Sequence, residues 1–169
     1  MSNRGKPLEA RGRMKRDRKA GLDLEALPGH YIRRLQQIAV AIFLQETGRH
    51  GVTPVQYAAL HKIGIVPGID QRTLARAIGL DTSTVAGVVD RLEARGLMQR
   101  SASPEDRRVR LLSLTKPGQE LLEAIEPDML KAQDRILAPL PKAERAEFLR
   151  MLRTLVTANN EMSRAPSDM

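Results

Sequence analysis

The stretch 70–115 most constrains the fold, because its apolar spacing changes from a helical to an extended period within one short segment. In 85–92, valine or leucine stands at the first, fourth, fifth and eighth places, which is the i, i+3, i+4, i+7 spacing of an amphipathic helix. Gly96 follows soon after, where a helix commonly ends in the left-handed conformation. The spacing therefore predicts a helix that buries one face and stops at Gly96.

A shorter helix is predicted just before this one. Asp70 is a favourable N-cap for it, and Gly79 supplies a turn at its end. Asp81 or Thr82 then caps the second helix. Two short helices joined by a turn that contains glycine are typical of a helix-turn-helix.

The outward face of the second helix is built from short side chains rather than long charged ones. It carries Ser83, Thr84, Ala86, Gly87 and Arg91. A glycine in a helix interior costs about 1 kcal/mol relative to alanine. A DNA major groove explains the pattern, because hydroxyls reach base edges, arginine binds guanine or phosphate, and glycine lets the backbone come close. The alternative is that Ala86 and Gly87 pack against a neighbouring helix.

Two short extended runs follow, at 97–101 and 109–114, and a charged turn joins them. The turn contains Pro104, Asp106, Arg107 and Arg108. A hairpin directly after a helix-turn-helix is a wing. Its tip can follow the DNA backbone or enter the minor groove, where the narrow, negative floor attracts arginine.

The segments 80–100 and 103–118 make the chain resemble the MarR-type winged-helix transcription regulators. The second segment is the more specific, since Asp-x-Arg followed by a strand and Leu-Thr-x-x-Gly is close to a family signature. The matching residues are Asp106, Arg108, Leu114, Thr115 and Gly118. The likeness extends less specifically over 27–160, and it departs from the family at Ala86-Gly87, where a longer polar residue is frequent.

The fold class expected is mainly α: a winged helix-turn-helix with a small β-hairpin wing, and N- and C-terminal helices that form a dimerisation domain. The expected organisation is a basic arm (1–21), N-terminal dimerisation helices (22–52), the DNA-binding domain (53–115), C-terminal dimerisation helices (116–160) and a frayed tail (161–169). The terminal helices carry apolar stripes that the winged module is too small to cover. A homodimer is therefore expected, and the resemblance implies the same arrangement.

Charge is concentrated at the N-terminus of the chain. The net charge is +8, and residues 1–20 contain eight lysines or arginines against two acids, so this arm supplies +6. Such a patch is typical of a nucleic-acid binder. The alternatives are a solvated tail or, less favoured because an apolar face is missing, a segment for an anionic membrane surface.

Several classes of function are disfavoured by what the sequence lacks. Without cysteine there are no disulfides and no thiolate zinc site. The histidines, at 30, 50 and 61, lack metal-ligand spacing, so no metal or cofactor is expected. Acids such as Glu46, Glu93 and Glu123 are interpreted as parts of solvated helix faces. Because catalytic motifs are also missing, an enzyme is not expected. No apolar run reaches the length of a membrane span, so a cytoplasmic protein is expected.

A small-molecule effector is expected from the resemblance, bound between the dimer helices and the winged domain. The candidate residues are His30, Tyr31, Arg34, Tyr57 and His61. An arginine in an apolar cleft suits a carboxylate or phosphate. The resemblance implies that the effector is an aromatic acid or its CoA thioester. The alternative is that Arg33 and Arg34 form surface ion pairs and Tyr57 simply packs.

The sequence thus predicts a dimeric repressor of a palindromic double-stranded DNA operator. The candidate DNA contacts are Ser83, Thr84, Gly87, Arg91, Asp106, Arg107 and Arg108. Two alternatives stay open. One is an architectural DNA-binding protein without an effector, and the other is a winged-helix module that binds proteins.

Overall fold

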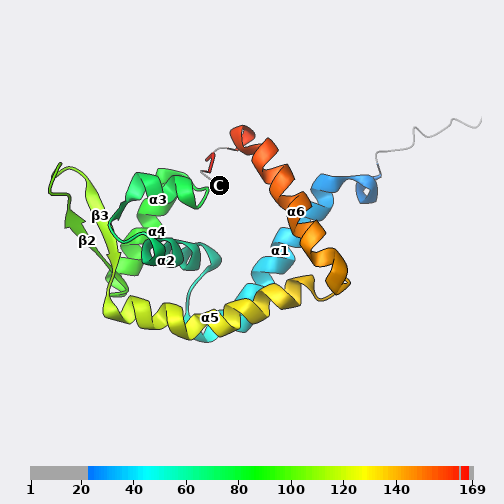
Figure 1. Cartoon of the computed structure of the whole chain (residues 1–169), viewed down its shortest axis with the longest axis horizontal. Coiled ribbons are helices and arrows are strands. Elements are labelled where there is room, and N and C mark those ends of the chain that lie inside the picture. The colour runs from blue at the N-terminus through cyan, green and yellow to red at the C-terminus, as the bar shows by residue number, and fades with distance from the viewer. Residues whose placement is uncertain (1–22, 164, 168–169) are drawn as a thin grey trace, which may run out of the picture. The chain divides into compact units, whose positions relative to one another are not determined.

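The computed structural model describes residues 23–163 and 165–167, which fall into two compact units divided after Leu35. The described part of the first unit consists of the short 3-10 helix η1 (Leu24–Ala26) and the beginning of α1 (Pro28–Thr47). The second unit continues from Gln36 and contains everything that follows (Figure 1). The predicted arm 1–21 lies outside the described residues.

A winged helix-turn-helix occupies the first half of the second unit. After the 3-10 turn η2 (Gly48–His50), it runs in the order α2 (Pro54–Ile65), β1 (Ile69–Asp70), α3 (Gln71–Ala77), α4 (Thr82–Ala94), β2 (Met98–Ala102) and β3 (Arg110–Leu114). The strands form an antiparallel sheet in the order β1-β3-β2. The predicted helix-turn-helix and hairpin are confirmed, whereas β1, which pairs Ile69 with Leu112, was not predicted.

Local hydrogen bonds explain where these helices begin. Thr53 and Gln56 form a reciprocal capping box at the start of α2. The Asp70 carboxylate accepts from two backbone amides of α3, and the Asp81 carboxylate accepts from the Thr84 amide of α4. Asp81, rather than Thr82, is therefore the cap of α4. Gly79 and Gly96 adopt positive φ values of 65° and 68° at the predicted turns.

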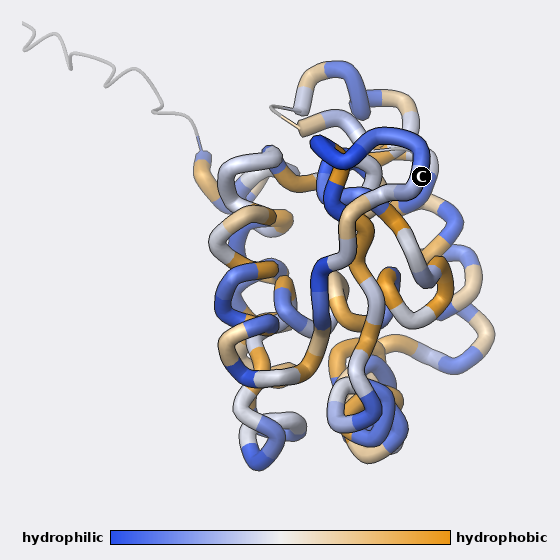
Figure 2. The backbone as a smooth tube through the Cα atoms, turned by 90° about the vertical axis from the view of Figure 1, so that its left-hand side faces the viewer, coloured by the Kyte–Doolittle hydropathy of each residue, from blue (hydrophilic) through white to orange (hydrophobic). Residues whose placement is uncertain are grey.

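The core of the module is mainly aliphatic. Orange and blue positions alternate along the helical turns in Figure 2, in the manner of amphipathic helices. The α4 face at 85, 88, 89 and 92 is buried against the sheet and the other helices. The largest fully buried aliphatic side chains are Leu60, Ile63, Leu74, Val85, Val89, Leu92, Met98, Leu112 and Ile125.

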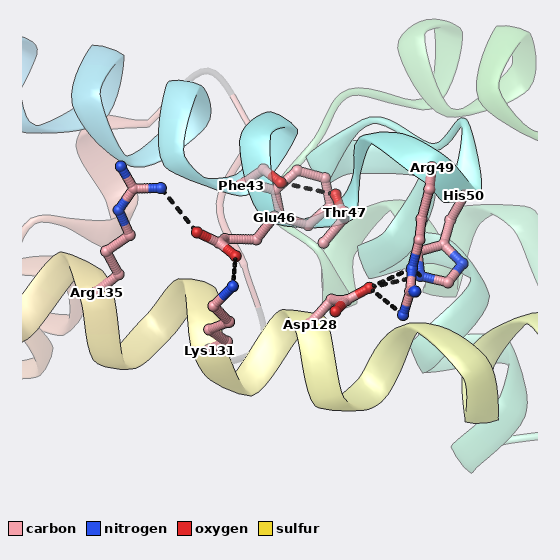
Figure 3. A network of polar contacts seen from close by, with 8 residues as sticks. All are labelled: Phe43, Glu46, Thr47, Arg49, His50, Asp128, Lys131 and Arg135. Carbon is pink, nitrogen blue, oxygen red and sulfur yellow. Dashed lines mark hydrogen bonds and ion pairs between the residues drawn. The ribbon is translucent and has the colours of Figure 1, made fainter.

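Two further helices, α5 (Lys116–Leu137) and α6 (Lys142–Ala158), follow the wing, and the 3-10 turn η3 (Asn160–Met162) ends the second unit's regular structure. Ion pairs hold α5 to the end of α1 (Figure 3). Glu46 lies 2.7 Å from both Lys131 and Arg135, and its side chain is 10% exposed. The interpretation of Glu46 as part of a solvated face is therefore wrong, because two cations from α5 cover it.

Among the described residues, every helix falls short of the length and apolarity needed to cross a membrane.

Candidate functional site

The outward face of α4 lies open, as the sequence predicted. Ser83, Thr84 and Arg91 are exposed, while Ala86 and Gly87 are half-buried. An alanine Cβ at Gly87 would lie 3.7 Å from the Arg91 guanidinium, and nothing outside α4 in the described structure would come within 4 Å of it. Packing against a neighbouring helix therefore does not explain this glycine within the chain.

Asp81 organises the N-terminal turn of this face. Its carboxylate accepts hydrogen bonds from the Ser83 hydroxyl (2.5 Å), the Thr84 hydroxyl (2.7 Å) and the Thr84 amide (2.8 Å). These donors, the Ser83 hydroxyl first, hold the pKa of Asp81 well below its usual range. Because both hydroxyl protons point to Asp81, the two hydroxyl oxygens present lone pairs outward. They are therefore suited to accept hydrogen bonds from amino groups on base edges.

The wing tip is shaped by Asp106. Its carboxylate accepts from the Arg108 backbone amide (2.9 Å), and its carbonyl accepts from the Val109 amide (2.9 Å). The contact with Arg108 runs through the backbone, so Asp106 shapes the loop without occupying the guanidinium. Arg107 and Arg108 are both exposed.

Two arginines that the sequence did not single out hold α4 in place. Arg100, on β2, pairs with Asp90 and lies 2.7 Å from Glu93, both on α4. Arg95 donates to the carbonyls of Gly51 (2.7 Å) and His50 (3.3 Å). Glu93 is thus half of an ion pair rather than part of a solvated face. Local spacing did not reveal these contacts, because Arg100 reaches α4 from a different element and the partners of Arg95 lie far away in the chain.

Tyr57 and His61, from the predicted effector set, lie together on α2. Their rings stack with centroids 5.7 Å apart, and Tyr57 also contacts Phe43 at 6.1 Å. Burial, reinforced by the charge of Glu126, raises the pKa of Tyr57. A small cavity of about 190 Å³ is lined by Tyr57, His61, Leu122, Glu123 and Glu126. Glu123 is exposed, as the interpretation as a solvated face expected, and it also lines this cavity.

The other predicted effector residues belong to the first unit. His30 and Tyr31 form an edge-to-face pair with centroids 5.6 Å apart, and Arg34 is exposed on the same stretch of α1. His50 lies elsewhere, at the end of η2, with Nε2 2.8 Å from the Asp128 carboxylate (Figure 3). Within the described ranges, no group of three or more histidines or acids is placed to hold a metal ion.

Comparison with known proteins gives a consistent result. The MarR family model matches residues 52–109 of the chain. The regulatory protein described as putative for the hcr operon of Thauera aromatica is 37% identical over 134 residues, covering 79% of this chain and 81% of that protein.

Solved structures of regulators are also similar. The PcaV transcriptional regulator from Streptomyces coelicolor, in complex with its natural ligand, has a TM-score of 0.77 and 37% identity, and covers 82% of this chain and 98% of that one. The repressor CouR bound to a 23-mer DNA duplex has a TM-score of 0.75 and 30% identity, covering 79% and 94%. BpsR from Bordetella bronchiseptica, whose DNA binding is regulated by 6-hydroxynicotinic acid, has a TM-score of 0.71 and 33% identity, covering 75% and 96%.

Proposed function

This chain belongs to the MarR family of transcriptional regulators, and we propose that it is a repressor that binds a palindromic DNA operator as a homodimer. The observation that carries the proposal is the open face of α4, whose short polar side chains belong to the same winged module as the exposed Arg107 and Arg108. The similar repressor CouR is seen bound to a DNA duplex, which supports DNA binding by this chain.

The proposed contacts divide between the two grooves. Ser83, Thr84 and Arg91 contact bases or phosphates in the major groove, and Gly87 allows the α4 backbone to come close. Arg108 enters the minor groove from a loop that Asp106 shapes, while Arg107 contacts phosphates. The basic arm adds phosphate contacts that carry little sequence information.

The homodimer is proposed from apolar surface that the chain leaves open. On α6, which has no buried residue, Leu149, Met151, Leu155 and Val156 are all more than a third exposed. Ile38 and Leu44 on α1 are exposed to a similar degree. A two-fold dimer that covers these side chains presents two recognition helices about 34 Å apart, one DNA turn. An effector that changes this spacing releases the operator without unfolding the protein.

The proposed effector is a small aromatic acid or its CoA thioester. Its support is the regulation of BpsR by 6-hydroxynicotinic acid. Glu123 and Glu126 repel an anion from their side of the cavity but accept hydrogen bonds from a ring hydroxyl. Arg34 is proposed to meet the carboxylate.

Isothermal titration with 6-hydroxynicotinic acid and related hydroxylated aromatic acids, on the native chain, Arg34→Ala and Arg33→Ala, tests the effector class. We expect binding that Arg34→Ala abolishes and Arg33→Ala leaves largely intact. Heat from none of these compounds, or equal affinity in all three proteins, argues against this effector class.

Fluorescence anisotropy tests the regulator itself, with the DNA upstream of its own gene and a scrambled duplex at two salt concentrations. We expect a preference for the upstream DNA that survives at the higher salt, because base contacts depend less on counterion release than phosphate contacts do. Equal, salt-sensitive binding to both duplexes favours the architectural alternative. Failure to bind either duplex favours the module that binds proteins.

A further inference from the structure

The C-terminal tail, which we define as residues 159–163 and 165–167, folds back onto the helix-turn-helix. The side chain of Asn160 holds it at two points: its amide nitrogen donates to the Ser167 carbonyl (2.8 Å), and its oxygen accepts from the Ser167 amide (2.9 Å). The Ser167 Cβ lies 3.6 Å from where a Cβ on Gly79 would stand. Gly79 is the turn between α3 and α4, so the tail reaches the helix-turn-helix itself (Figure 1).

The tail shares a hollow with the DNA-facing end of α4. The hollow has a volume of about 500 Å³ and is more polar than apolar in its lining. Its walls are Gly79, Leu80, Asp81, Ser83, Thr84, Ser163 and Ala165. Two tail residues, Ser163 and Ala165, therefore line the same hollow as Ser83 and Thr84, whose hydroxyls are proposed to contact base edges. A DNA backbone flanking the first turn of α4 needs this same space.

The charge of the tail also disfavours DNA close to it. By sequence, 159–169 contains two acids and one arginine, whereas the rest of the chain carries a clear excess of positive charge. In the structure, Glu161 is exposed within the tail. A tail with a net negative charge beside the first turn of α4 repels the phosphates of an approaching DNA backbone.

We propose that the tail is an autoinhibitory latch, which covers the N-terminal turn of α4 and must leave before this turn enters the major groove. The latch rests on the proposed DNA-binding function. Its hold is modest, since Glu161, Met162 and Pro166 within it are exposed, so DNA displaces it at a small cost. A latch that is closed about ten times as often as it is open weakens apparent DNA affinity about tenfold, equivalent to about 1.4 kcal/mol.

Adjacent asparagines supply a matched pair of variants. Asn160→Ala removes both hydrogen bonds to Ser167, while Asn159→Ala removes a bond to the Leu155 carbonyl (2.7 Å) within α6. In anisotropy titrations with the upstream duplex, we expect Asn160→Ala and a chain ending at Asn159 to bind about 3- to 10-fold more tightly than the native chain. Asn159→Ala should bind like the native chain. Unchanged or weaker binding by the first two proteins overturns the latch, and weaker binding identifies the tail as part of the DNA interface.

A disulfide tests the position of the tail independently of DNA. The chain has no cysteine, and the 3.6 Å separation lies within the range that disulfides accept between Cβ atoms, so Gly79→Cys with Ser167→Cys can cross-link. The strain of a cysteine at the positive φ of Gly79 is the same in the oxidised and reduced forms, so comparison of these two forms removes it. We expect an intrachain cross-link on non-reducing gels, and DNA binding that is at least about tenfold weaker when oxidised than when reduced.

The outcomes separate the two proposals. Failure to cross-link, or a cross-link between two copies of the chain, overturns the latch whatever the DNA result. An intrachain cross-link with equal DNA binding in both forms also overturns it. If the intrachain cross-link forms but every variant fails to bind DNA in both forms, the proposed function fails, and the inhibitory role of the tail fails with it.

Discussion

Replacing Gly87 by alanine separates the stability of the fold from the fit to DNA. In the folded chain the added methyl group meets the Arg91 guanidinium at 3.7 Å, an ordinary van der Waals contact, and nothing outside α4 in the described structure approaches more closely. Alanine is favoured over glycine in a helix interior by about 1 kcal/mol. Because the methyl group causes no clash, we expect the free energy of unfolding to rise by about 0.5–1 kcal/mol.

The same methyl group should weaken operator binding. If Gly87 lets the α4 backbone lie close to the base edges, the new Cβ must push the helix outward or distort the groove. Overpacking of one methyl group in a close-fitting interface costs about 1–2 kcal/mol, the lower part of the range for protein cores. This cost corresponds to about 5- to 30-fold weaker binding. The variant should therefore be more stable and bind less tightly.

Both quantities can be measured on one preparation. Urea denaturation followed by circular dichroism gives the change in unfolding free energy, and fluorescence anisotropy with the operator gives the change in affinity. A lower free energy of unfolding refutes the inference that the added methyl group fits without a clash. Unchanged or tighter DNA binding refutes the close approach, and the glycine is then left without a functional reason.

Three further predictions follow from the structure. Gly118→Ala should destabilise the chain by about 2–4 kcal/mol in urea, since its Cβ would stand 1.9 Å from the Leu97 carbonyl oxygen, and native stability would refute this close packing. Arg108→Ala should weaken operator binding by about 1–3 kcal/mol in anisotropy titrations while leaving the urea midpoint unchanged, and full affinity would remove Arg108 from the interface. Asp81→Asn should lessen the fall of the urea midpoint between about pH 5 and pH 2.5. Hydrogen bonds, first that from the Ser83 hydroxyl, lower the pKa of Asp81 from 3.8. The carboxylate therefore stabilises the fold fully above that value, and this stabilisation is lost as the pH falls toward the folded-state pKa. Equal acid sensitivity in both proteins would contradict this role.

Caps and turns could be predicted because their physics is local. Asp70, Asp81 and Thr53 each bond a backbone amide two or three residues ahead, so a short stretch of sequence contains both partners. Gly79 and Gly96 likewise satisfy a requirement of their own backbone positions. The apolar period of α4 then fixed which face is buried, and with it which face is left for DNA.

Contacts between distant segments could not be predicted in this way. The two-residue strand β1 is too short to show a period, and it forms because β3 offers a partner. Glu46 and Glu93 look like solvated acids in a helical pattern, yet Lys131, Arg135 and Arg100 reach them from other elements. The tail looked frayed because the turn at Gly79, which it approaches, lies far away in the sequence, although the hydrogen bonds between Asn160 and Ser167 are local.

The DNA-facing hydroxyls show how the two kinds of information combine. Short hydroxyl side chains at 83 and 84 indicate base contacts, but a hydroxyl can donate or accept, so the sequence leaves the polarity of recognition undecided. The structure assigns both protons to Asp81, whose low pKa keeps it ionised and accepting throughout the neutral range. The Ser83 and Thr84 oxygens then face outward as acceptors and favour the amino groups of adenine or cytosine over the carbonyl oxygens of guanine or thymine. Asp81 thus contributes to sequence preference without contacting a base, because it fixes where its neighbours' protons point.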